Sequence, residues 1–206
     1  MRNYKTQSVI NITGLALGFT AFALAGYWYL WEHSFDTFHP EWKRTYAITT
    51  SGNSKTSTGE DEEMNQLYES DANVLMSHPF VEKSCRLWDT WGTWSVINES
   101  DRRERFYGFN VDSAFFSVFQ ADFLEGNVYR IPCNNEYIVL TRSAAMRLFS
   151  RTKCVGEVIR LNNRQDVTVA AVMEDYPDNT ELYFNMLILA SEDKLKNNRE
   201  IGRAHV

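Results

Sequence analysis

The chain has 206 residues, of which 21 are basic and 27 are acidic, so its formal net charge is −6 at pH 7. The first 31 residues contain only two charged side chains, Arg2 and Lys5, which leaves 19 basic against 27 acidic side chains, a net charge of −8, in the rest. Since a surface that binds phosphate groups needs an excess of basic residues, this balance argues against nucleic acid as a partner.

Residues 9–31 contain no charged side chain. As a helix, a segment of this length is long enough to cross the roughly 30 Å hydrocarbon core of a bilayer. We therefore predict a transmembrane helix over residues 9–31. Arg2 and Lys5 precede it, whereas Glu32 and Asp36 follow it, and basic residues are retained on the cytoplasmic side. This asymmetry predicts that residues 1–8 are cytoplasmic and that the bulk of the chain lies outside the cytoplasm.

A cleavable signal peptide is the alternative, because residues 23–25 (Ala-Leu-Ala) resemble a cleavage site after a basic start and an apolar run. The run continues through the aromatic residues of 27–31, however, which suits an interfacial aromatic belt better. Small residues would let a second helix pack closely against this one, although ordinary transmembrane composition explains them equally well. They are Gly14, Gly18, Ala21 and Ala25.

The segment after the helix predicts several local elements. Residues 45–50 are typical of a strand, and residues 51–59 form a loop rich in Ser, Thr and Gly, which we expect to be mobile. Acidic residues 60–63 precede an apolar pattern with helical spacing, which predicts an amphipathic helix that ends near residues 78–79.

Short β-like runs follow over residues 81–111, broken by turn residues at 89–90, 98–101 and Gly108, which predicts an antiparallel meander. Asp112 and Ser113 provide an N-cap for a short helix over residues 114–119. We expect three phenylalanines of this helix to be buried in the core. They are Phe115, Phe116 and Phe119.

The last part of the chain predicts a strand over 137–140, a helix over 142–149 capped by Thr141, and a hairpin of 155–161 with 167–173. Short helices inserted between mostly antiparallel strands make the fold class α+β.

Several clusters of polar or aromatic residues are candidate sites. A metal centre near the helix would use His33, Asp36, His39 and Glu41, but no recognised ligand pattern completes it, so a structural role is favoured. Three tryptophans, Trp88, Trp91 and Trp94, would form either a stacking platform for a ligand or, as we favour, part of the core and its turns. Three arginines beside acidic residues indicate a solvated turn. They are Arg102, Arg103 and Arg105.

The cysteines are Cys85, Cys133 and Cys154. An oxidising compartment permits one disulfide among three cysteines, but the spacing selects no pair, and buried free thiols explain the pattern equally well. The sequence contains no nucleophile elbow, phosphate-binding loop, dinucleotide fingerprint or zinc-protease motif. Residues 98–100 (Asn-Glu-Ser) match a glycosylation acceptor, a match that is common by chance.

Several short motifs stand in the order found in the N-terminal part of MacB/FtsX-like ABC transporter permeases, and residues 8–190 as a whole resemble that family. Residues 8–18 resemble its first membrane helix. The juxtamembrane signature is matched by Phe35, Asp36, Phe38, His39, Arg44 and Tyr46. Later motifs are matched by Asp112, Phe115, Phe116, Phe119, Gly126, Gly156 and Pro177. The chain departs from the family pattern at Thr45 and Ser150, which affects details of turns.

The resemblance implies residues 1–8 in the cytoplasm, a transmembrane helix over 9–31 and part of a MacB-like periplasmic core domain over 32–199. It implies a permease subunit that transmits ATP-driven motion from the membrane to the periplasmic domain, for export or extraction of a substrate that the sequence does not identify. Such permeases carry no ATPase of their own, and ATP is expected on a separate or fused ATPase. For this chain we expect no catalytic site, cofactor or metal centre. The partners implied are the inner membrane, an ABC ATPase subunit, a second permease copy and a periplasmic partner protein.

Family members continue with the rest of the periplasmic domain and at least three further membrane helices, so we expect this chain to be an N-terminal fragment. Residues 200–206 match an in-frame translation of a common sequencing adaptor, and we expect this tail to be non-native. The alternative function is a single-pass membrane-anchored sensor or ligand-binding domain without a role in transport.

Overall fold

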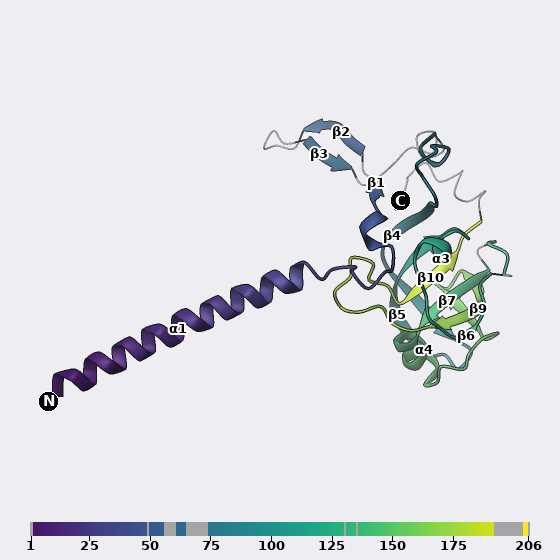
Figure 1. Ribbon diagram of the computed structural model, residues 1–206. Helices are drawn as coiled ribbons and strands as arrows, with labels where there is room; N and C mark the ends of the chain where they lie inside the picture. Colours follow the sequence, from purple (N-terminus) through teal and green to yellow (C-terminus); the bar gives the residue numbers. More distant parts are fainter. Residues whose placement is uncertain are drawn as a thin grey trace. The chain divides into compact units, whose positions relative to one another are not determined.

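The computed structural model describes residues 2–48, 50–55, 61–64, 74–129, 131–134, 136–191 and 204–205 (Figure 1). Side chains are described over residues 5–48, 74–87, 93–129, 131–134 and 136–191. The chain divides into two compact units. One unit comprises Met1–Phe38 with Pro177–Glu181, and the other, called the core unit below, comprises His39–Tyr176 with Leu182–Val206.

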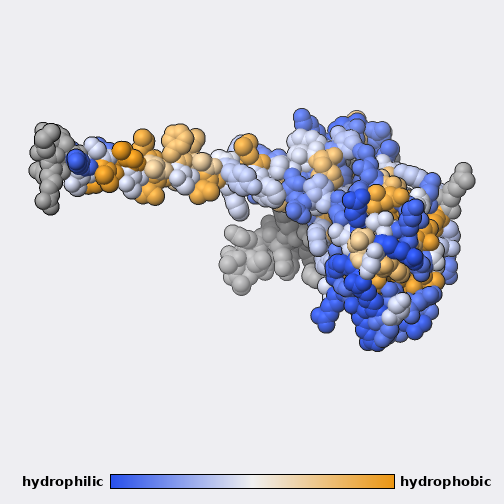
Figure 2. All heavy atoms as spheres, turned by 90° about the horizontal axis from the view of Figure 1, so that it is seen from below, coloured by the Kyte–Doolittle hydropathy of each residue, from blue (hydrophilic) through white to orange (hydrophobic). Residues whose placement is uncertain are grey.

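The first unit contains the helix α1, Arg2–Glu32. Its segment Lys5–Glu32 is the one helix among the described residues that is long and apolar enough to cross a membrane, a property that a signal sequence shares. Figure 2 shows apolar side chains all along this helix, as a helix surrounded by lipid requires. An added Cβ at Gly14 or Gly18 would meet no atom within 4 Å, so both glycines leave an open surface on α1.

The core unit is built on a nine-stranded mixed sheet. Its strands are β1 (Ala47–Ile48), β4 (Cys85–Asn98), β5 (Arg103–Val111), β6 (Phe123–Gly126), β7 (Tyr137–Thr141), β8 (Val158–Leu161), β9 (Gln165–Met173), β10 (Met186–Leu189) and β11 (Ala204–His205). The pairings run from β4 through β5, β10, β7, β9 and β8 back to β4, and they therefore close a six-stranded ring. Of these pairings, β5 with β10 and β7 with β9 are parallel, and the rest are antiparallel.

Two apolar clusters lie on opposite faces of the strands, because alternate side chains of a strand point to opposite faces. In β10, Leu187 and Leu189 belong to one cluster, whereas Met186 and Ile188 belong to the other. The first cluster includes the short helix α3, Phe115–Val118, and the second includes α4, Arg142–Phe149. Burial of both faces explains why β7, β9 and β10 are nearly continuous apolar runs.

The elements predicted for the last part of the chain are confirmed. Thr141 caps α4, since its side chain accepts a hydrogen bond from the backbone N–H of Ala144. Strands β8 and β9 form the predicted hairpin, with β8 beginning at Val158, three residues later than expected. Asn162 and Asn163 in its turn have positive φ angles of 49° and 57°, a conformation that asparagine tolerates.

The region before β4 differs from the prediction. Strand β1 covers only Ala47–Ile48 of the expected strand over 45–50. Strands β2 (Thr50–Lys55) and β3 (Asp61–Met64) form an antiparallel pair. The predicted loop over 51–59 is therefore wrong at residues 51–55, and the predicted helix start is wrong at residues 61–63. Residues 56–60 lie outside the described part of the chain. Residues 65–73 of that expected helix lie outside the described part, and residues 74–76 are helical. Between α1 and β1, a 3₁₀ helix η1 spans Trp42–Arg44.

The meander over 81–111 is a single long hairpin of β4 and β5, with the predicted turn at residues 98–101. The expected turn at 89–90 is wrong, because these residues lie within β4, where the register shifts between Asp89 and Thr93. Gly108 is no turn either. It lies inside β5, where an added Cβ would come within 2.7 Å of Met186 Cγ and 2.9 Å of Met186 O, so a close approach of β10 requires the glycine.

The helix predicted over 114–119 exists as the shorter α3. The N-cap residue is Ala114, which makes no side-chain capping hydrogen bond, and not the predicted Asp112 and Ser113. Asp112 lies two residues earlier, where its carboxylate accepts hydrogen bonds from the backbone N–H of Ala114 (3.0 Å) and of Arg86 (2.9 Å). Burial raises the pKa of Asp112 above its ordinary value, and the backbone hydrogen bonds from Arg86 and Ala114 act in the opposite direction. Phe115, Phe116 and Phe119 are all buried in the first apolar cluster, as predicted.

Candidate functional site at the juxtamembrane turn

The chain leaves α1 through a turn held by local hydrogen bonds. The backbone N–H and the hydroxyl of Ser34 both donate to Trp31 O, and the hydroxyl of Thr37 donates to Ser34 O. Asp36 has a φ of 55°, in the left-handed region that only glycine, asparagine and aspartate visit readily. The sequence therefore supplies, at position 36, one of the few side chains that this turn accepts.

A segment distant in sequence, Pro177–Glu181, belongs to the same unit as this turn. The backbone N–H of Asp36 donates to Asn179 O at 3.0 Å. The Thr180 hydroxyl donates to Asp36 Oδ1 at 2.5 Å, and the N–H of Glu181 lies 3.4 Å from Asp36 Oδ2. Asn179 Nδ2 donates to Ser34 O at 2.8 Å and to Ser34 Oγ at 3.0 Å. We call these five residues, 34, 36 and 179–181, the juxtamembrane cluster.

The juxtamembrane cluster is a specific structure and not a set of passing surface contacts. Thr180 is only 8% exposed, and Asp36 and Asn179 are half-buried. Hydrogen bonds to a charged group contribute about 1.5–3 kcal/mol each, and a buried donor that loses its acceptor carries the desolvation penalty as well. Removal of the Asp36 carboxylate would therefore separate the turn after α1 from residues 177–181.

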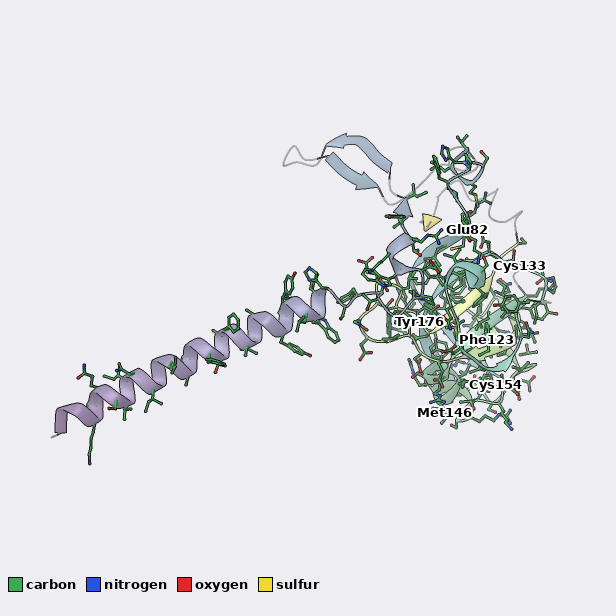
Figure 3. All side chains as sticks on the ribbon, viewed as in Figure 1. Glu82, Phe123, Cys133, Met146, Cys154 and Tyr176 are labelled. Atoms are coloured by element: carbon green, nitrogen blue, oxygen red, sulfur yellow. The ribbon has the colours of Figure 1, made fainter. Side chains whose placement is uncertain are left out.

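The two segments continue into the core unit, where they supply a second contact. The imidazole of His39, which is 5% exposed, packs edge-on against Phe119 and Tyr176, with ring centroids 5.2 Å apart in both pairs. The Tyr176 hydroxyl donates to Gln120 O at 2.9 Å, and its ring also contacts Phe184 (Tyr176 is labelled in Figure 3). His39 and Tyr176 thereby take part in the packing of the first apolar cluster.

The residue before Tyr176 contacts another element. Asp175 accepts hydrogen bonds from the N–H and the hydroxyl of Ser143, in the first turn of α4, where a carboxylate is favoured by the helix dipole. Arg142 and Glu174 form an exposed ion pair at 2.8 Å. Residues 174–181 thus contact in turn the start of α4, the residues after α3 and the turn after α1.

The other residues of the predicted motifs are placed as follows. Phe35 packs edge-on against Trp31 at 6.2 Å, Arg44 pairs with Glu82 at 2.8 Å, and the Tyr46 hydroxyl donates to Lys43 O. Phe38 is half-buried and Pro177 is exposed. Gly126 has a φ of 82°, and an added Cβ there would lie 2.3 Å from Ala170 O. Gly156 has a φ of 88°, with open space around it. These glycines serve the backbone of the core unit.

The predicted metal-capable residues make contacts within the protein. Nδ1 of His33 lies 2.9 Å from Tyr29 O, Asp36 belongs to the juxtamembrane cluster, and Glu41 contacts Arg44. No group of three His, Cys, Asp or Glu side chains suited to a metal ion occurs within the described ranges.

The remaining polar and aromatic candidates are placed as follows, where the structure describes their side chains. Trp94 packs against the second apolar cluster, whereas the side chains of Trp88 and Trp91 lie outside the described residues. At the tip of the β4–β5 hairpin, Arg102 and Arg103 pair with Glu104 and Asp101, and all three predicted arginines are exposed. Asn98 Nδ2 donates to Leu148 O, so the side chain of the matched glycosylation acceptor is engaged with α4.

Cys85 and Cys154 are buried in different apolar clusters and are not joined by a disulfide. Burial, with a smaller effect of Asp112, raises the pKa of the Cys85 thiol far above its ordinary value. Burial, with the carboxylate of Glu125 nearby, raises the pKa of Cys154 to about 11. Neither thiol is activated for chemistry, because the nucleophilic form is the thiolate.

Comparisons with known proteins agree with this architecture. The family model of the MacB-like periplasmic core domain matches residues 8–200. A domain of a protein described as a permease from Porphyromonas gingivalis superimposes with a TM-score of 0.65 and 20% identity, covering 82% of this chain and 76% of that one. The extracellular domain of the noncanonic ABC-type transporter YknZ from Gram-positive bacteria gives 0.57 and 14%, covering 79% and 82%.

The periplasmic region of MacB from Actinobacillus actinomycetemcomitans likewise gives a TM-score of 0.57 at 15% identity, covering 79% of this chain and 72% of that one. At these identities the structural likeness concerns the fold, and it confirms the α+β class. No curated protein sequence matches the chain.

Proposed function

The chain belongs to the family of MacB-like periplasmic core domains, and on this premise we propose that it is the N-terminal part of a permease that transmits motion between the membrane and its external domain. An apolar N-terminal helix followed by such a domain fits a membrane-anchored protein. Permeases of this family act with ABC ATPases, so the energy would come from ATP hydrolysed by another polypeptide or domain. The comparisons favour this function over a single-pass sensor.

The juxtamembrane cluster is the observation that carries the proposal. The covalent link between α1 and the core unit is the peptide bond between Phe38 and His39, and a single chain can rotate about its backbone dihedral angles. The cluster adds a second link, because residues 177–181 are continuous with core residues Tyr176 and Leu182 on both sides. With two links, a movement of the end of α1 would be transmitted to the core unit.

The test compares three variants of the complete permease, in lipid nanodiscs with its ATPase. Asp36→Ala removes the carboxylate, Thr180→Val removes only the hydroxyl donor, and Asp178→Ala changes an exposed acid of the same loop as the control. Spin labels at Glu32→Cys and Tyr129→Cys report the distance between the helix end and the core unit.

We expect a narrow distance distribution in the parent and in Asp178→Ala, and broad distributions in Asp36→Ala and Thr180→Val. ATP hydrolysis should continue in all of them, because no variant touches the ATPase. A distribution that stays as narrow in Asp36→Ala and Thr180→Val as in the parent would show that the cluster does not couple the two units.

A further inference from the structure

We infer that the core unit carries a surface that docks onto the headgroup region of the membrane through Trp42, Tyr46 and Phe80, called the aromatic surface below. The inference rests on the membrane anchoring by α1 proposed above, and it adds a lipid partner for the core unit. Trp42 is 43% exposed, Tyr46 is 64% exposed and Phe80 is 91% exposed.

The exposed residues Trp42 and Tyr46 belong to an ordered region. Lys43 Nζ lies 5.3 Å from the ring centroid of Trp42, and the Tyr46 hydroxyl donates to the backbone carbonyl of Lys43, so both aromatic side chains contact this lysine. No residue of η1 is buried. Residues 42, 43 and 46 therefore present two exposed aromatic rings, with the positive charge of Lys43 over the ring of Trp42.

Phe80 precedes a chain segment that contacts η1. Glu82, labelled in Figure 3, pairs with Arg44 of η1 at 2.8 Å. The next residue, Lys83, donates to Ser117 O at 3.2 Å, which ties the same segment to α3. The His78 ring stacks on Phe80 at 5.1 Å. Glu82 and Lys83 are held by these contacts, so the exposed ring of Phe80 lies next to a fixed stretch of backbone.

The nature of the partner follows from the residue types and from chain length. Trp and Tyr are enriched at membrane interfaces, and lysine suits the phosphate groups there. Trp42 lies ten residues after the end of α1 at Glu32. Ten residues span at most about 36 Å when fully extended, so Trp42 lies within this distance of the end of α1. The headgroup region at that end of the helix is therefore within reach of Trp42.

The experiment uses the full chain in phosphatidylcholine nanodiscs. Cys133→Ser provides the background, since Cys85 and Cys154 are buried thiols. The environment-sensitive fluorophore NBD is attached at Phe80→Cys or, as the control, at Tyr129→Cys, a tyrosine that is 71% exposed elsewhere on the core unit. A nitroxide carried high on the lipid acyl chain quenches NBD that enters the interface.

We expect blue-shifted NBD emission and loss of emission with nitroxide lipid at position 80, and neither change at position 129. Adding Trp42→Ser to the Phe80→Cys protein should reduce the quenching, and unreactive Cys85 confirms that this variant is folded. Absence of quenching at position 80 while α1 is shown to span the disc would overturn the lipid surface and leave the anchoring intact. A blue shift without quenching would overturn it too, in favour of a protein partner or a second copy.

Discussion

Cys154 shows how burial and one neighbouring carboxylate act on a single side chain. The thiol is 2% exposed, and the backbone N–H groups of Cys154 and Val155 both donate to Glu125 Oε2, at 2.8 and 3.2 Å. The carboxylate thus holds the loop before β8 against β6. The same carboxylate repels a thiolate, and burial disfavours the thiolate further, so the pKa of Cys154 rises to about 11.

A pH dependence of stability follows from this shift. The pKa of Cys154 is higher in the folded state than the ordinary thiol value of 9.0, so the folded state binds the proton more tightly. Its contribution to stability is present below pH 9 and is lost as the pH rises towards 11. The difference in urea midpoint between the parent and Cys154→Ala should therefore shrink over this range. A difference that stays constant up to pH 11 would contradict the buried thiol.

Sequence alone could predict some residues and not others for a physical reason. Thr141 was predictable as a cap because a cap acts within three residues of its own position. Gly108 was misread as a turn, because a glycine in a strand and a glycine in a turn give the same local signal, and only Met186 on the neighbouring strand distinguishes them. Asp36 was identified within a motif, but its partner Thr180 is 144 residues away.

At the scale of elements, the burial of α3 in the core unit can be tested directly by mutation. Phe116 is 7% exposed, and its ring lies 5.2 Å from Phe115 and 5.5 Å from Phe123 of β6. We expect Phe116→Ala to destabilise the core unit by about 3–5 kcal/mol, through lost burial and the cavity left behind. Limited proteolysis of the full-length permease measures the loss of folded protein.

The exposed residue before the same helix provides the control, since Ser113→Ala should leave protease resistance unchanged. If Phe116→Ala remained as resistant as the parent and impaired only the permease's activity, these phenylalanines would belong to a functional surface and not to the core.

Predictability also varied among the elements. The hairpin of β8 and β9 and the helix α4 have strong local signals, namely apolar runs, a cap and a turn with two asparagines. Strands β2 and β3 have polar sequences, Thr-Ser-Gly-Asn-Ser-Lys and Asp-Glu-Glu-Met, that resemble a loop and a helix start. Their pairing with each other supplies what their local propensity lacks.

At the scale of the whole molecule, the charge pattern predicts the orientation of the chain in the membrane. Arg2 and Lys5 should keep the N-terminus in the cytoplasm, with Lys55 on the outer side. In intact spheroplasts and a Cys133→Ser background, an impermeant maleimide should modify Lys55→Cys and not Arg2→Cys. Both native thiols that remain are buried and should stay unlabelled. Labelling at position 2 instead of 55 would mean that the orientation is reversed.

The order of several short motifs was enough to predict the family and the class of fold, because each motif is local and their order is read directly from the chain. The motifs and their order did not predict the juxtamembrane cluster. Residues 34–36 and 179–181 occur in two separate segments, and no pattern in either states that they meet. The adaptor origin of residues 200–206 stays a prediction, and residues 204–205 pair with β1 and β4 as β11.

The position of β10 has a mechanical consequence. Only four residues, 182–185, separate the juxtamembrane cluster from β10, and three of them, Leu182, Phe184 and Asn185, are buried. Strand β10 pairs with β5 on one side and with β7 on the other. A pull that arrives along the chain would load both hydrogen-bond ladders in shear, with many bonds sharing the tension at once. A strand at the end of the sheet, such as β6 with β9 as its pairing partner, would peel away bond by bond. Force transmitted through residues 177–181 would therefore reach the core unit at a strand that is paired on both sides.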